Sequence, residues 1–214
     1  MRAEKPLIVF DLDGTLLDSY ELALRCHAFA IEAVGLPPVS LAVLESLNGP
    51  TIEEECAILG LPPERMSAYH EAIVRSEREV APPLVRAFPG VPEMLSALEA
   101  RATLCVLTNG LDSYLRMVCG LTGIARFFSE SAAFAAGVPK AARIRRWLEA
   151  RGMPPALAVG DRPSDVSAGR EAGAGTLAVT YGNGEAAQLA HADALADTVD
   201  EVRAYCEIFV KNNS

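Results

Sequence analysis

The sequence lacks the cysteine pairs, long apolar runs and basic stretches that would assign it to several classes of protein. Its five cysteines, at positions 26, 56, 105, 119 and 206, form no CxxC pair. A dispersed, odd-numbered set favours reduced, buried thiols in a cytoplasmic protein. No stretch approaches the roughly 20 apolar residues that a membrane-spanning helix needs, and the apolar run after the N-terminus is too short for a signal peptide. We therefore expect an unexported, cytoplasmic protein without a membrane partner.

Positive charge is also scarce. The chain has 19 lysines and arginines against 28 acidic residues, a formal net charge of -9 and a pI near 4.9. This balance argues against nucleic acid or an anionic membrane surface as the main partner. A small anionic substrate remains possible where local cations outweigh the global charge. With 214 residues and 50% hydrophobic composition, the chain can bury a sizeable core, and one domain with a large insert fits this length.

Short apolar runs that end in polar residues recur along the chain. They cover residues 7–10, 104–107, 156–159 and 176–179, and helix-like segments at 91–102, 111–120 and 140–151 lie between the later ones. Apolar runs of this length alternating with helices predict parallel strands buried on both faces, which is a doubly wound α/β core. In such sheets, ligands bind at the carboxyl ends of the strands. The polar clusters after these runs are therefore candidate site residues.

A stretch of about 70 residues between the first two runs has no convincing strand character. Segments 20–34, 41–47, 52–59 and 65–80 have the pattern of helices, with proline and glycine between them. A crossover connection rarely needs so much chain. The sequence therefore predicts an all-α insert over residues 18–85, within an α/β core formed by residues 1–17 and 86–214.

Two pairs of carboxylates follow predicted strands. Asp11 and Asp13 come directly after the run 7–10, and Asp161 and Asp165 lie four residues apart at the start of a helix after the run 156–159. Strand-end turns and helix capping are the alternative explanations for these acids. If the two strand ends face one cleft, however, four carboxylates converge there. Such a set suits a hard divalent cation with oxygen ligands, and Mg²⁺ fits best.

Two further polar groups extend this pattern. Thr108 and Asn109 precede Gly110 after the apolar run 104–107, where a phosphate-binding loop and a simple turn are both possible. Lys140 opens a helix after a Gly-Val-Pro segment, where a surface lysine is the alternative.

Taken in order, these residues resemble the four motifs of the haloacid dehalogenase superfamily. The matching segments are V-F-D-L-D-G-T-L-L-D, L-T-N-G, the lysine, and V-G-D-R-P-S-D, and they extend over most of the chain. The helical insert looks like the mobile cap of the phosphoglycolate phosphatase-like branch. One departure is that Lys140 is followed by alanine, where that branch commonly has proline.

The resemblance implies a Mg²⁺-dependent phosphatase that works through an aspartyl-phosphate intermediate. The substrate would be a small phosphorylated metabolite such as phosphoglycolate, a sugar phosphate or a nucleotide. The implied roles are Asp11 as nucleophile, Asp13 as general acid and base, and Thr108, Asn109 and Lys140 as phosphate ligands, with Mg²⁺ held by Asp11, Asp13 through its backbone carbonyl, Asp161 and Asp165. An acid at position 13 favours ester cleavage over dehalogenation, because a leaving alkoxide needs a proton.

Two other functions remain open from the sequence. A phosphoglucomutase-like phosphoryl transferase would use the same residues, and a non-catalytic receiver-like signalling module also gathers Asp, Thr and Lys at strand ends. For neighbouring residues we expect structural roles: a local hydrogen bond for Thr15, a solvated helix face for Glu21, Arg25 and His27, and packing for Tyr114. Residues 48–51 form a predicted loop that could reach over the cleft.

Overall fold

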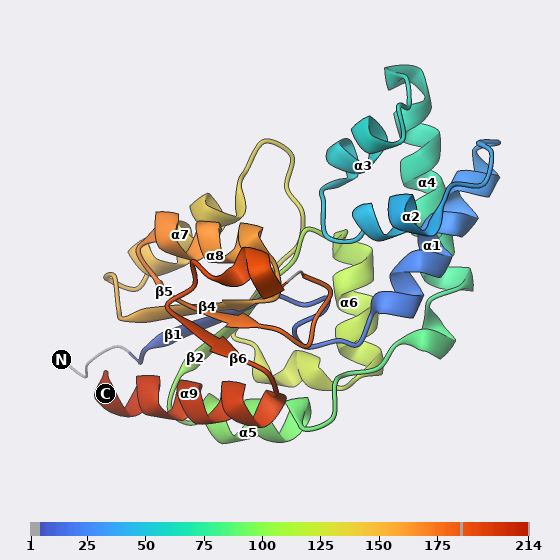
Figure 1. Ribbon diagram of the computed structural model, residues 1–214. Coiled ribbons are helices and arrows are strands. Elements are labelled where there is room, and N and C mark those ends of the chain that lie inside the picture. The colour runs from blue at the N-terminus through green and yellow to red at the C-terminus, as the bar shows by residue number, and fades with distance from the viewer. Residues whose placement is uncertain (1–4, 185, 214) are drawn as a thin grey trace.

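A six-stranded, all-parallel sheet forms the centre of the computed structural model, which describes residues 5–184 and 186–213 (Figure 1). The strand order is β3-β2-β1-β4-β5-β6. The strands are β1 (Leu7–Phe10), β2 (Thr103–Leu107), β3 (Glu130–Ala132), β4 (Ala156–Gly160), β5 (Gly175–Val179) and β6 (Ala194–Ala196). Residues 1–4, 185 and 214 belong to the predicted core ranges but lie outside the described residues. The predicted doubly wound α/β fold class is confirmed.

Alternate residues of β1 point to opposite faces of the sheet, and helices cover both faces. Ile8 and Phe10 belong to the hydrophobic cluster that includes α5 (Val91–Glu99), α6 (Asp112–Leu121) and α9 (Val199–Asn212). Leu7 and Val9 pack in a second cluster with α7 (Lys140–Glu149) and α8 (Pro163–Ala172). All four β1 side chains are buried, which explains why this strand is a continuous apolar run without alternation.

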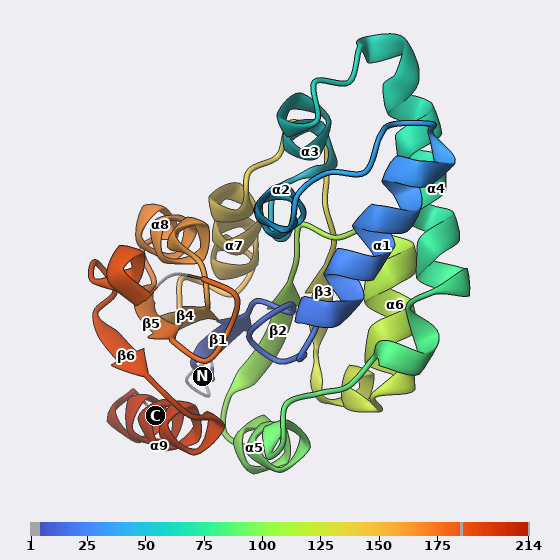
Figure 2. The ribbon, with the colours of Figure 1, turned by 45° about the vertical axis from the view of Figure 1, so that its right-hand side comes forward.

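The first four α-helices after β1 form a separate group beside the sheet, over the carboxyl ends of its strands (Figure 2). Their own core contains Ile31, Leu47, Cys56 and Ile73, and Tyr69 at its centre is fully buried. The helices are α1 (Tyr20–Ala33), α2 (Leu41–Ser46), α3 (Ile52–Ile58) and α4 (Pro63–Glu79). Below, we call this group the cap helices.

The two ends of the predicted insert lie side by side. The amide of Asp18 donates to the carbonyl of Arg86 at 3.1 Å, and the Arg86 guanidinium pairs with the Asp18 carboxylate at 2.8 Å. Leu17 and Ala87 form an antiparallel bridge next to them. This arrangement is compatible with an insert over residues 18–85, whose boundaries stay a prediction.

The sequence did not predict β3, β6 or α9. Both strands have three residues, lie at the edges of the sheet and are only partly buried, so they lack the apolar run that identified the central strands. Three short 3₁₀ helices complete the elements of the described residues: η1 (Pro82–Leu84), η2 (Ile124–Phe127) and η3 (Ala186–Leu189). Within the described residues, no helix has the length and apolar character to cross a membrane. The five cysteines, all of them described, are buried and unpaired.

Candidate active site

The loop after β1 holds Asp11 and Asp13 at the carboxyl edge of the sheet. The amide of Asp11 donates to the Val159 carbonyl of β4 at 2.8 Å. This bond fixes the backbone of Asp11, and with it the position from which the side chain extends. Gly14 then turns the chain with a φ of +76°, and a Cβ at this position would lie 2.3 Å from Asp161 Oδ2. The β1 loop therefore approaches the loop after β4 too closely for any side chain at position 14.

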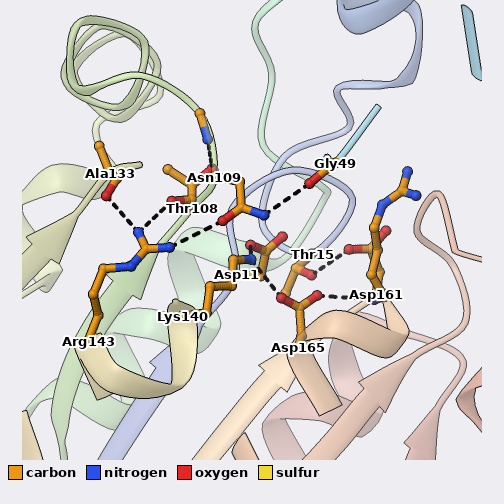
Figure 3. A network of polar contacts seen from close by, with 12 residues as sticks. Asp11, Thr15, Gly49, Thr108, Asn109, Ala133, Lys140, Arg143, Asp161 and Asp165 are labelled. Carbon is orange, nitrogen blue, oxygen red and sulfur yellow. Dashed lines mark hydrogen bonds and ion pairs between the residues drawn. The ribbon is translucent and has the colours of Figure 1, made fainter. Parts of the chain in front are cut away.

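Three of the predicted carboxylates converge at this edge (Figure 3). Asp11, Asp161 and Asp165 each offer a ligand atom, and these atoms all lie within 4.8 Å of one another. Asp161 follows β4 and is fully buried, and Asp165 lies in the first turn of α8 and is 6% exposed. Neighbouring strands β1 and β4 thus bring together side chains 150 positions apart in the sequence.

Lys140 lies among these carboxylates. Its Nζ donates to Asp11 Oδ1 at 2.5 Å and to Asp165 Oδ1 at 2.7 Å (Figure 3). Its side chain is only 11% exposed. Burial disfavours the ammonium charge, but Asp11 and Asp165 outweigh this effect and raise the pKa of Lys140. The alternative of a surface lysine is therefore wrong.

Three carboxylates surround the single ammonium of Lys140, and this crowding disfavours their ionised forms. Burial, followed by repulsion from Asp165, raises the pKa of Asp11 well above its usual range, although Lys140 opposes the shift. Burial and Asp165 likewise raise the pKa of Asp161 to about 6. One ammonium cannot balance three carboxylates, so the ionised cluster favours an additional cation.

The carboxyl of Asp13 is held apart from this cluster. Tyr114 Oη of α6 donates to Asp13 Oδ1 at 2.5 Å. Burial raises the pKa of Asp13, although the Tyr114 hydrogen bond partly offsets the effect. Tyr114, predicted only to pack, is buried and also positions a candidate acid, a role that its apolar neighbours in the sequence conceal.

The loop after β2 joins the sheet edge to the cap helices. Thr108 Oγ1 accepts a hydrogen bond from the amide of Gly110 at 2.9 Å. Arg143 of α7 donates to the Thr108 carbonyl at 3.1 Å and to Asn109 Oδ1 at 3.2 Å, and Asn109 Nδ2 donates to the Gly49 carbonyl at 3.1 Å (Figure 3). The predicted loop 48–51 therefore reaches the site. Arg143 was not predicted, since an arginine in a basic helix resembles a surface residue.

Comparison with known proteins identifies the family of this chain. The family model for haloacid dehalogenase-like hydrolases matches residues 8–179. The chain belongs to the haloacid dehalogenase-like hydrolase family. A phosphoglycolate phosphatase from Agrobacterium fabrum is 31% identical over 193 residues, covering 85% of this chain and 83% of that protein. A 5'-nucleotidase from Pseudomonas aeruginosa is 31% identical over 192 residues, covering 86% of each chain.

A solved structure agrees with this assignment. A haloacid dehalogenase-like family hydrolase from Streptococcus pneumoniae has a TM-score of 0.82 with 26% sequence identity, covering 96% of this chain and 99% of that one. The predictions of the family and of an enzyme of this family are therefore confirmed. A non-catalytic receiver-like module, the alternative from another class, finds no support among these relatives.

Of the expectations for neighbouring residues, the one for Thr15 is confirmed but incomplete, and the one for His27 is wrong. The amide of Thr15 donates locally to the Leu12 carbonyl at 3.4 Å, and its Oγ1 also donates to Asp161 Oδ1 at 3.4 Å across the two loops. His27 lies on α1 but is 8% exposed, whereas Glu21 and Arg25 are exposed as predicted. His27 faces α3 and α4, and the sequence pattern of α1 alone does not show where those helices pack.

His27 belongs to a buried polar group between three cap helices. Its Nδ1 lies 3.3 Å from Tyr69 Oη, which donates to Glu55 Oε2 at 3.1 Å. Burial lowers the pKa of His27 to about 4 and raises the pKa of Glu55 to about 8. The hydrolase therefore keeps a neutral histidine at pH 7, beside a carboxyl that ionises only in mildly basic solution.

Glu55→Gln is expected to change how stability depends on pH. Below pH about 4.5, Glu55 is protonated in both the folded and the unfolded protein, so its pKa shift does not affect stability. Between pH about 4.5 and about 8, Glu55 ionises in the unfolded protein but stays protonated in the folded protein, so the free energy of unfolding falls as the pH rises. The wild type should lose several kcal/mol of unfolding free energy over this range, and Glu55→Gln should lose markedly less. Urea unfolding at both ends of the range measures the difference. Glu53→Gln, an exposed change on the same helix, should behave as the wild type, and an equal loss in all three proteins would contradict the assignment.

Proposed function

We propose that this protein is a Mg²⁺-dependent phosphatase that hydrolyses a small-metabolite phosphate monoester through an aspartyl-phosphate at Asp11. The observation that carries this proposal is the convergence of Asp11, Asp161 and Asp165 around Lys140, with Asp13 held apart by Tyr114. The relatives named phosphoglycolate phosphatase and 5'-nucleotidase support small phosphorylated substrates.

The donor set fits Mg²⁺. The ligand atoms within 4.8 Å of one another are all carboxylate oxygens, the donors that this hard cation prefers. The side chains of Asp11, Asp161 and Asp165 would hold it, together with the backbone carbonyl of Asp13. When bound, Mg²⁺ supplies positive charge that offsets the repulsion between the Asp11 carboxylate and a phosphate dianion. This repulsion is about 4 kcal/mol for each pair of unit charges at 4 Å and an effective dielectric of about 20.

Asp11 and Asp13 divide the chemistry between them. An oxygen of the Asp11 carboxylate attacks phosphorus, the bond to the ester oxygen breaks, and the protonated Asp13 carboxyl gives its proton to the leaving oxygen. The raised pKa of Asp13 suits this donation. In the second displacement, Asp13 accepts a proton from the water that attacks the acyl phosphate, which regenerates both carboxyl groups.

The remaining polar residues bind the phosphate. Lys140 would contribute an ammonium that already touches Asp11, and Thr108 and Asn109 would contribute hydroxyl and amide groups at the carboxyl end of β2. Arg143 would preorganise the Thr108–Asn109 loop for this role, since it donates to the Thr108 carbonyl and to Asn109 Oδ1. Such preorganised donors stabilise the charge that develops on the transferred group.

A substrate screen with and without metal tests the proposed function. Phosphorylated metabolites should release inorganic phosphate with Mg²⁺, and a chelator should abolish the release until Mg²⁺ is added back. Mg²⁺ at about 100 times its Kd should also raise the Tm by about 5–10 °C, since it stabilises only the folded state. Asp161→Asn should lose most of this Tm shift. Full activity in the chelator, or an undiminished shift in Asp161→Asn, would contradict the metal assignment.

A further inference from the structure

The cleft above the carboxylates has one wall from the core and one from the cap helices. The core wall includes Asp11, Asp13 and Lys140, and the cap wall includes His27, Glu55 and Glu77 among apolar side chains such as Leu22, Leu47 and Ile73. Its cavity volume of about 110 Å³ is several times the roughly 10–15 Å³ that one water needs. This space suits a short leaving group with an apolar stem.

Charge is distributed unevenly between these walls. Among the described residues that line the cleft, the lysines and arginines are Lys140 and Arg162 alone, and both come from the core. Lys140 is paired with two carboxylates, and the Arg162 side chain lies against Gly49 on the loop between α2 and α3. Within the described part of the chain, the cap wall thus presents two carboxyl groups and no lysine or arginine.

Polar atoms on the cap wall have unused hydrogen-bonding capacity. Glu55 accepts from Tyr69 at 3.1 Å and Glu77 accepts from Ser113 at 2.9 Å, in each case through Oε2, so these two bonds leave the Oε1 atom of each carboxyl unoccupied. Asn48, only 5% exposed, lines the same cleft, and its amide nitrogen finds no hydrogen-bond partner in the described part of the chain. A buried amide such as that of Asn48 requires a partner, and a bound ligand can supply it.

We propose that the cap wall selects a phosphate monoester whose leaving group carries hydroxyl or amine donors and no negative charge, such as a short polyol or amino alcohol. This proposal rests on the proposed function. Hydroxyl or amine hydrogens would bond to Glu55 and Glu77, and a hydroxyl oxygen would accept from Asn48. Once Glu55 and Glu77 are ionised, the carboxylate of phosphoglycolate would instead approach two negative charges without a facing cation, so this substrate is disfavoured.

Three esters of similar size test the proposal: phosphoglycolate, ethylene glycol monophosphate and phosphoethanolamine. At a pH above 8, where burial no longer keeps either glutamate protonated, the wild type should hydrolyse the last two with kcat/KM about 10- to 100-fold above that for phosphoglycolate. Glu55→Gln and Glu77→Gln should each reduce this preference by about tenfold. Glu53→Gln and Glu79→Gln, exposed changes on the same two helices, should leave it unchanged.

The possible outcomes separate this proposal from the proposed function. Equal or faster turnover of phosphoglycolate by the wild type would overturn the selectivity. A loss of phosphoglycolate turnover alone in Arg162→Gln would also overturn it, because it would show that Arg162 of the core binds the substrate carboxylate. A preference unchanged in both glutamine variants would also overturn it. Failure of the phosphatase proposal itself would look different: neither these esters nor p-nitrophenyl phosphate would be hydrolysed faster by the wild type than by Asp11→Asn.

Discussion

Asp11→Asn is expected to reduce the hydrolysis of every phosphate monoester by about 10⁴-fold or more. An amide oxygen is a far weaker nucleophile than a carboxylate, and removing a covalent nucleophile typically costs this much in kcat. The loss should be in kcat for good and poor leaving groups alike, since the attack on phosphorus is common to all of them. Steady-state phosphate release with p-nitrophenyl phosphate and with an alkyl phosphate measures it.

The matched control for this variant is Asp18→Asn, which removes the last carboxylate of the same sequence motif. Asp18 pairs with Arg86 outside the cluster, so this change should leave turnover within a fewfold of wild type. Asp11→Asn should remain folded, because it removes one of three clustered negative charges and keeps the side-chain shape. Substantial activity in folded Asp11→Asn would eliminate Asp11 as the nucleophile.

Asp13→Asn should have an effect that depends on the leaving group. An alkyl phosphate releases a strongly basic alkoxide that needs a proton, so loss of the acid should slow its hydrolysis by about 10² to 10⁴-fold. p-Nitrophenolate leaves without protonation, and formation of the acyl phosphate from this ester should be much less affected. Pre-steady-state release of p-nitrophenol isolates that first step.

Comparing the two leaving groups tests the assignment of Asp13 directly. In the second displacement Asp13 accepts a proton from water, so steady-state turnover of p-nitrophenyl phosphate should still slow after a fast first release. The acyl phosphate should therefore accumulate in Asp13→Asn. An equal slowing of the first step for both esters would show that Asp13 does not act as the proton donor.

The predictable part of the fold was its centre. Strands β1, β2, β4 and β5 are four to five residues long and largely buried, so the apolar runs that encode them stand out in the sequence. The edge strands β3 and β6 bury little and leave no such run. The aspartates could be predicted because parallel strands bring their carboxyl ends to one edge.

Residues that act between elements were harder to predict. Tyr114 and Arg143 lie on helices where their apolar and basic neighbours suggest packing and solvation, and their contacts with Asp13 and Asn109 exist only in three dimensions. His27 and Glu55 belong to separate cap helices. No short motif connects them, because their proximity depends on how the insert packs.

The central claim is that Asp11 carries the phosphoryl group during turnover. Quenching the enzyme during hydrolysis and reducing it with borohydride converts an aspartyl phosphate to homoserine, which peptide mass spectrometry can locate. The account predicts homoserine at position 11, enriched in Asp13→Asn and missing when substrate is omitted. Homoserine at the position of another aspartate would contradict the account. So would the lack of homoserine at every position in Asp13→Asn, where the intermediate should accumulate while substrate is consumed.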